Sequence, residues 1–231
     1  MAAARSSTGN RRRIVLPVVV AVVAGMAAIG LAVTGNDGET ESIAAVTTVG
    51  GATTSPADPL ALGDPDAPVV MVSYSEFQCP FCGRYARETE PELVERFVDT
   101  GVLRIEWRDF PYLGEESLVA AAAARAASEQ GEFWSFHDRL FADQSQPNSG
   151  RLTATFLEGI AAELGLDVEQ FRRDMSSAET MSAIDADFAE ALSVGVNGTP
   201  AFMINGEPVF GAQPTSVFVD VIERAAAAAA D

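Results

Sequence analysis

Hydrophobic and polar positions divide the chain into a long apolar stretch, a polar segment and a region of short periodic patterns. The 20 residues from Ile14 to Val33 carry no charge, and about 20 apolar residues are enough to cross a bilayer. Residues 34–66 are rich in Gly, Thr, Asp, Glu, Ala and Pro and lack periodicity, which is typical of a flexible linker. The pattern predicts a transmembrane anchor at 14–33, a linker at 34–66 and a folded domain at 67–231.

Two segments early in the folded region have β patterns. Residues 69–74 form a β-like run, and residues 102–107 alternate apolar and polar side chains. A helix is expected between them, from Cys79 onwards. Strand, helix, strand implies a right-handed crossover and a parallel pair of strands.

Helical patterns fill residues 115–193, and a hairpin with a final helix follows. Thr153 can cap one helix, and Asp167 with Gln170 resembles a capping box for the next. Two short apolar runs, 201–204 and 208–210, flank Asn205-Gly206, a strong hairpin signal. The last helix is expected to begin at Pro214.

The chain has only two cysteines, Cys79 and Cys82, and they lie where the first strand meets the first helix. This spacing places both sulfurs at the first helical turn, where unpaired N–H groups stabilise a thiolate. Pro80 suits the first helical position because it has no N–H to lose. A lone CxxC in this context indicates a redox dithiol. A structural disulfide closing so short a loop would stabilise little. A metal site, chiefly for copper(I), normally needs three or four ligands, and beyond the two thiols the chain offers one histidine, His137, which lies far away in sequence.

Charge along the chain indicates where the dithiol works. Residues 1–13 carry four arginines and no acid, so the positive-inside rule places this basic segment in the cytoplasm and the rest of the chain outside, where redox conditions are oxidising. A cleaved signal peptide is the rival interpretation, although its apolar region is usually shorter.

After Val33 there are 11 arginines and 33 acidic residues, which give this part of the chain a formal charge of −22. Such a surface repels nucleic acid and anionic lipid.

Two motifs more than a hundred residues apart resemble those of the DsbA-like thiol:disulfide oxidoreductases. One is SEFQCPFCG at 75–83; the other is GVNGTPAF at 195–202. Phe133-Trp134 with His137-Asp138 is also similar to the family's insertion helix. The resemblance covers roughly residues 66–225. Together with the order of elements, it implies an α/β thioredoxin fold with a helical insertion at about 115–193, behind a single N-terminal transmembrane helix.

The resemblance implies roles for residues in both motifs. Cys79 would be the exposed nucleophile and Cys82 the buried resolving thiol. Thr199-Pro200 would form a cis-proline loop that faces the dithiol and aligns an extended substrate segment. Phe81, between the cysteines, is expected to be exposed and to contact substrate.

Other residues near the motifs have more than one interpretation. Thioredoxin-like proteins often carry a buried acid six residues before the nucleophile, but Ser73 stands there. Glu76 could replace it in proton handling, although a solvated charge at the end of the strand is the favoured interpretation. A structural role is expected for His137. Phe77 and Phe202 could form an apolar rim for substrate, but core packing is the default for phenylalanine.

The combined hypothesis is a membrane-anchored, extracytoplasmic enzyme that donates the Cys79–Cys82 disulfide to reduced exported proteins. No organic cofactor and no metal is implied. Reoxidation would require a quinone-linked membrane partner of the DsbB or vitamin-K-epoxide-reductase type, which the resemblance alone implies. Two alternatives stay open: a disulfide reductase or isomerase, and a non-enzymatic copper-binding or protein-docking module.

Overall fold

A five-stranded mixed sheet organises the folded unit. The computed structural model describes residues 47–49 and 51–230. The strand order is β3-β5-β4-β6-β7, in which β4 and β5 are parallel and the other pairs antiparallel. The strands are β3 (Ala61–Leu62), β4 (Val69–Ser75), β5 (Leu103–Asp109), β6 (Ala201–Ile204) and β7 (Glu207–Phe210). The predicted parallel pair and the hairpin at Asn205-Gly206 are both confirmed.

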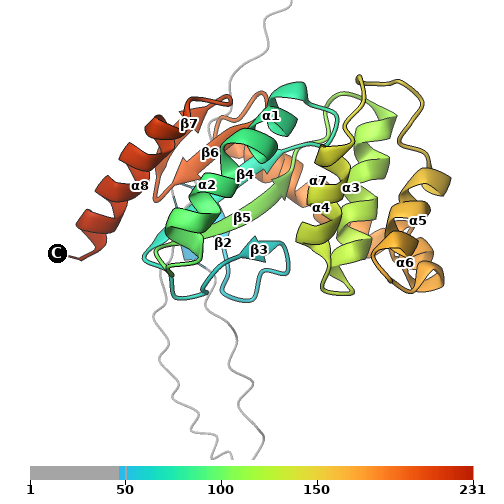
Figure 1. Cartoon of the computed structure of the whole chain (residues 1–231), viewed down its shortest axis with the longest axis horizontal. Coiled ribbons are helices and arrows are strands. Elements are labelled where there is room, and N and C mark those ends of the chain that lie inside the picture. The colour runs from blue at the N-terminus through green and yellow to red at the C-terminus, as the bar shows by residue number, and fades with distance from the viewer. Residues whose placement is uncertain (1–46, 50, 231) are drawn as a thin grey trace, which may run out of the picture. The chain divides into compact units, whose positions relative to one another are not determined.

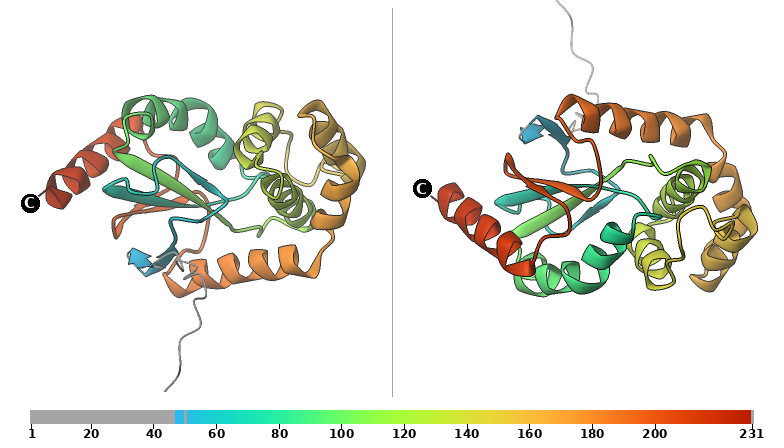
Figure 2. Two further views of the ribbon diagram at one scale, coloured as in Figure 1. Left: turned by 90° about the horizontal axis from the view of Figure 1, so that it is seen from below. Right: turned by 90° about the horizontal axis from the view of Figure 1, so that it is seen from above.

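Helices cover both faces of the sheet (Figures 1 and 2). One face is covered by α1 (Pro80–Glu88), α2 (Glu90–Leu93), the π-helical turn η1 (Val94–Val98) and α8 (Thr215–Ala229). The opposite face is covered by α7 (Ala178–Ser193). Because β4 is covered on both faces, nearly all of its side chains are buried and most of them are apolar.

The helical insertion predicted at about 115–193 is confirmed as a layer at one end of the sheet (Figure 2). It contains α3 (Glu115–Ser128), α4 (Phe133–Ala142), α5 (Ala154–Glu163) and α6 (Val168–Met175), and it ends with α7. The Thr153 and Asp167 side chains accept hydrogen bonds from the Phe156 and Gln170 N–H groups, so both predicted caps are present. The alanine-rich face of α3 lies in the core, where small side chains allow close helix packing.

The expected linker boundary at residue 66 is wrong for the part of the segment that the structure describes. Strands β1 (Thr47–Val49) and β2 (Ala52–Thr54) pair with each other, and β3 pairs antiparallel with β5. Leu60 is buried in the core of the insertion. The folded unit therefore begins well before residue 67.

Buried charges on β5 explain why this polar segment folds. Arg104, Glu106 and Arg108 alternate with the apolar side chains of β5, and all three are buried. The Arg104 guanidinium donates to the Ser55 carbonyl oxygen at 2.8 Å, and Arg108 donates to the Asp58 carboxylate at 2.6 Å. Buried charges need such partners, and the polar segment supplies them.

The predicted transmembrane anchor at 14–33 lies outside the described residues. Within residues 47–49 and 51–230, no helix has the length and apolar character needed to cross a bilayer.

Candidate active site

The dithiol lies at the junction of β4 and α1, as the sequence predicts. Cys79 is the N-cap residue of α1 with an extended backbone, and Pro80 occupies the first turn. The Gly83 N–H donates to the Cys79 carbonyl oxygen at 3.1 Å, which begins the helix. Both cysteines are free thiols in this structure, so it represents the reduced form of the pair.

The expectation that Cys79 is the exposed sulfur is wrong, because both cysteines are buried, with residue exposures of 2% for Cys79 and 1% for Cys82. The two thiols nevertheless have opposite acidities. A hydrogen bond from the Cys82 thiol is the largest effect that lowers the pKa of Cys79, to about 6, and burial opposes it. Burial is also the main reason that the pKa of Cys82 lies well above its usual value. The pair therefore holds one thiolate, on Cys79, near neutral pH.

The loop before β6 faces the dithiol, as predicted. The peptide bond between Thr199 and Pro200 is cis, and the Thr199 carbonyl oxygen lies 3.4 Å from the Cys79 sulfur. The Thr199 hydroxyl oxygen is buried without a hydrogen-bond partner within the described residues. It is free to donate to a thiolate, and its position beside the Cys79 sulfur contributes to the lowered pKa of Cys79.

Glu76 is buried, so its interpretation as a solvated charge is wrong. Its exposure is 2%, and neither carboxylate oxygen has a hydrogen-bond partner within residues 47–49 and 51–230 that meets normal geometry. Burial, and after it the nearby Cys79, raise the pKa of Glu76 to about 7, while the Ser117 hydroxyl opposes the shift. The carboxyl group can therefore take up or release a proton near neutral pH.

The aromatic residues around the site divide into one exposed ring and a buried set. Phe81 is 56% exposed, as predicted, and the Arg84 guanidinium lies 5.3 Å from the centre of its ring. Phe77 and Phe202 are core residues; Phe77 stacks on Trp107 with a centroid separation of 5.0 Å. The possible rim role of Phe77 and Phe202 is therefore excluded.

Sequence reasoning missed two residues at this site. The Gln144 side-chain amide donates to the carbonyl oxygens of Phe77 and Cys79, both at 2.9 Å, and so holds the start of α1 against the insertion. Tyr112 is 45% exposed; burial raises its pKa, and the nearby Cys79 raises it further. Both residues lie in loops without a local motif, and only the tertiary structure brings them to the dithiol.

A dithiol at a helix N-terminus, opposed by a proline loop on the neighbouring strand of a thioredoxin fold, defines a thiol:disulfide oxidoreductase. Comparisons with known proteins agree. The family model described as Thioredoxin matches residues 55–224. The probable disulfide bond formation protein D of Bacillus anthracis is 33% identical over 149 residues, which cover 63% of this chain and 69% of that protein. The chain belongs to the thioredoxin family, as a DsbA-like thiol:disulfide oxidoreductase.

Solved structures show the same fold. The α-DsbA1 protein of Wolbachia pipientis is 26% identical with a TM-score of 0.67, over 74% of this chain and 92% of that one. Oxidised BdbD from Bacillus subtilis is 22% identical with a TM-score of 0.68, over 73% of this chain and 92% of that one. The helical insertion is therefore part of a shared fold.

Proposed function

We propose that this enzyme is an extracytoplasmic oxidase that donates the Cys79–Cys82 disulfide to exported proteins. The observation that carries the proposal is the acidity of Cys79, whose pKa is lowered to about 6. A stabilised thiolate favours the reduced form of the pair over the disulfide, which makes the disulfide a better oxidant. Each unit by which the pKa of Cys79 is lowered stabilises the reduced form by about 1.4 kcal/mol, which raises the redox potential of this two-electron couple by roughly 30 mV.

The reaction proceeds in two exchanges. A substrate thiolate attacks the Cys79 sulfur, the Cys79–Cys82 bond breaks, and Cys82 leaves as a thiolate that takes up a proton because its pKa is high. A second substrate thiolate then attacks the substrate sulfur of the mixed disulfide and releases the Cys79 thiolate. The substrate loses two electrons and the enzyme pair gains them. We assign proton handling to Glu76, on the basis of its burial and its pKa of about 7.

Substrate binding is assigned to Thr199, Pro200 and Phe81. The Thr199 carbonyl oxygen is close to the Cys79 sulfur, so a chain segment aligned along this loop would have its cysteine beside the nucleophile. The exposed Phe81 ring provides apolar contact for an unfolded substrate. Only backbone and apolar contacts are involved, which suits an enzyme acting on many sequences.

The proposed topology has a cytoplasmic segment at 1–13, an anchor at 14–33 and the catalytic unit outside. Four arginines before the apolar stretch support this orientation. The name of the Bacillus anthracis relative, a probable disulfide bond formation protein, supports the oxidising direction. Reoxidation would then fall to a quinone-linked membrane partner of the DsbB or vitamin-K-epoxide-reductase type.

The redox potential tests the direction of the reaction. Equilibration with glutathione buffers is expected to give a potential above about −200 mV, more oxidising than typical glutaredoxins. The oxidised protein is also expected to form disulfides in a reduced, unfolded substrate faster than glutathione disulfide does. A potential near about −270 mV, the thioredoxin range, would contradict the donor role and favour the reductase alternative.

A further inference from the structure

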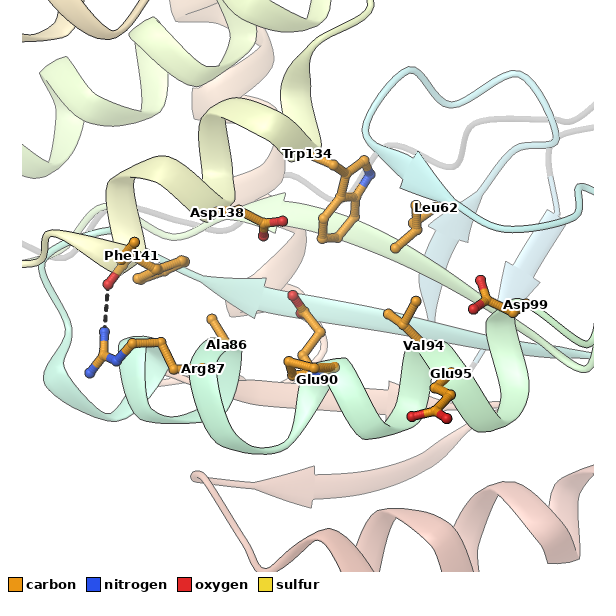
Figure 3. Close-up of a pocket in the computed structure, with 12 residues that line it drawn as sticks. Leu62, Ala86, Arg87, Glu90, Val94, Glu95, Asp99, Trp134, Asp138 and Phe141 are labelled. Carbon is orange, nitrogen blue, oxygen red and sulfur yellow. Dashed lines mark hydrogen bonds between the residues drawn. The ribbon is translucent and has the colours of Figure 1, made fainter. Parts of the chain in front are cut away.

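A pocket of about 710 Å³ lies beside the dithiol helix, between the α1–α2–η1 segment and α4 (Figure 3). A space of this size is typical of sites for small organic molecules. Apolar side chains form most of its walls, among them Ala86, Val94, Trp134 and Phe141. None of these residues takes part in the proposed disulfide exchange, so the pocket is a second concave site on the folded unit.

Glu90, the first residue of α2, directs a buried carboxylate into this pocket, toward α4 (Figure 3). Its side chain is 8% exposed, and among the residues that the structure describes its carboxylate accepts no hydrogen bond. The His137 Nε2 lies 3.9 Å from the Glu90 Oε1, too far for a hydrogen bond, and the His137 Nδ1 already lies 2.9 Å from the Asp138 carboxylate. A buried carboxylate is costly unless it is paired, so the pocket has an acceptor that a ligand could satisfy.

The charges around the pocket favour a cationic ligand. The residues that line it include one base, Arg87, and four acids: Glu90, Glu95, Asp99 and Asp138. The Arg87 guanidinium donates to the Phe141 carbonyl oxygen at 2.7 Å (Figure 3), so its charge is directed away from Glu90. A concave site lined by charges of one sign attracts ligands of the opposite sign.

The combination of a buried carboxylate with apolar walls selects the class of cation. An inorganic ion would contact the carboxylate and leave the apolar walls uncovered. An ammonium group on a hydrocarbon body would donate charge-assisted hydrogen bonds to Glu90 and would remove the apolar walls from water. The Trp134 ring lies across the pocket from Glu90 (Figure 3) and adds an aromatic wall, against which organic cations pack favourably. We propose that this pocket binds a small organic ammonium ion with an apolar body, and that Glu90 holds its ammonium group.

A ligand in this pocket would join the dithiol-bearing helix to the insertion. Ala86 belongs to α1, which also carries Cys82, whereas Trp134 and Phe141 belong to α4. A ligand that contacts both helices binds only the folded form, so it is expected to raise the melting temperature by mass action.

Titration with hexylammonium chloride tests the proposal. The full chain is kept reduced, which is the form that the structure represents. A pH of about 8 keeps Glu90 mostly ionised, because burial raises its pKa to about 7 while His137 opposes the shift. Saturable binding of one hexylammonium per chain is expected, at least about tenfold tighter than binding of hexanol, which has the same chain without the charge. Hexanoate, the anion of the same length, is expected not to bind.

Two matched variants test the role of Glu90. Glu90→Gln is expected to weaken hexylammonium binding at least about tenfold and to leave hexanol binding unchanged, because it removes the charge and keeps the shape. Glu95→Gln removes a carboxylate that lines the same pocket but is exposed and lies on the side of η1 away from Trp134 (Figure 3). This control is expected to bind hexylammonium as the wild type does. Disulfide exchange by the Glu90→Gln protein checks that the variant is folded.

NMR spectroscopy locates the ligand independently of the variants. Intermolecular nuclear Overhauser effects are expected between the hexyl chain and the methyl groups of Ala86 and Val94. The proposal would be overturned by an absence of saturable hexylammonium binding, by equal affinities for hexylammonium and hexanol, or by equal effects of Glu90→Gln and Glu95→Gln. Ligand contacts confined to other parts of the acidic surface would also overturn it. None of these results depends on the redox potential of the dithiol.

Discussion

The reactivity of Cys79 arises from its hydrogen-bond donors rather than from its exposure. Its sulfur is buried, yet its pKa falls to about 6 because the Cys82 thiol, the Thr199 hydroxyl and nearby backbone N–H groups all favour the thiolate. The pKa of Cys82 is shifted in the opposite direction, upward, chiefly because burial removes its thiol from water.

Replacement of Cys82 by serine tests the order of attack. Cys82→Ser is expected to accumulate mixed disulfides with exported proteins, because the Cys79 thiolate still reacts and no second thiol resolves the adduct. Non-reducing gels followed by mass spectrometry would detect them. Cys79→Ser is the control, and greater trapping in that variant would reverse the assigned roles.

The buried Glu76 carboxylate makes stability depend on pH. Its pKa is about 7 in the folded protein, above the ordinary value of 4.5. The contribution of the protonated carboxyl to folding stability is therefore fully present below about pH 4.5 and is lost as the pH rises through 7. Glu76→Gln is expected to stabilise the reduced protein above pH 7, by on the order of 3 kcal/mol at about 1.4 kcal/mol per pKa unit. This gain in the free energy of unfolding is expected to vanish as the pH falls toward 4.5.

Urea unfolding of both proteins at several pH values would measure this difference. A gain of equal size at all pH values would indicate that packing, rather than ionisation of Glu76, is responsible.

At the level of elements, strand pairing assembles the active site. Ser73 and Tyr74 of β4 pair with Phe202 and Ala201 of β6. This register brings the start of β6, and with it Thr199, next to the residues that follow β4. Pairing of β3 with β5, in turn, brings the polar segment before residue 67 onto the buried arginines.

Truncation of the polar segment tests its role in the fold. A chain that starts at residue 67 is expected to be less stable than one that starts at residue 47, because it loses the buried Leu60 and the partners of Arg104 and Arg108. Leu60→Ala alone is expected to cost about 2 to 5 kcal/mol. Denaturant unfolding would measure both, and equal stability of the two truncated chains would restore the linker interpretation.

At the level of the whole molecule, the part of the chain after the apolar stretch is strongly acidic. The chain after Val33 carries a formal charge of −22 and is repelled by anionic lipid. The proposed membrane attachment therefore rests on the apolar stretch at 14–33 rather than on the surface of the folded unit.

Cell fractionation with protease treatment tests this topology. The full-length protein is expected to pellet with membranes and to be digested by protease added from outside, whereas a form without residues 1–33 is expected to stay soluble. A soluble exported form that begins after about residue 33 would indicate a cleaved signal instead of an anchor.

Local patterns in the sequence determined most of the fold and the position of the dithiol. The β runs, the caps at Thr153 and Asp167 and the Asn205-Gly206 turn each depend on neighbouring residues, and all were predicted correctly. The spacing of Cys79 and Cys82 likewise depends only on helix geometry.

Only the tertiary structure decided which groups are buried and what they contact. Glu76 and the charged face of β5 have polar sequence patterns, but the insertion and the segment before residue 67 cover them. Gln144 reaches Cys79 from 65 residues away, and Glu90 meets His137 across two helices. Burial and long-range contact depend on how distant segments pack, and a pattern among neighbouring residues carries no information about that packing.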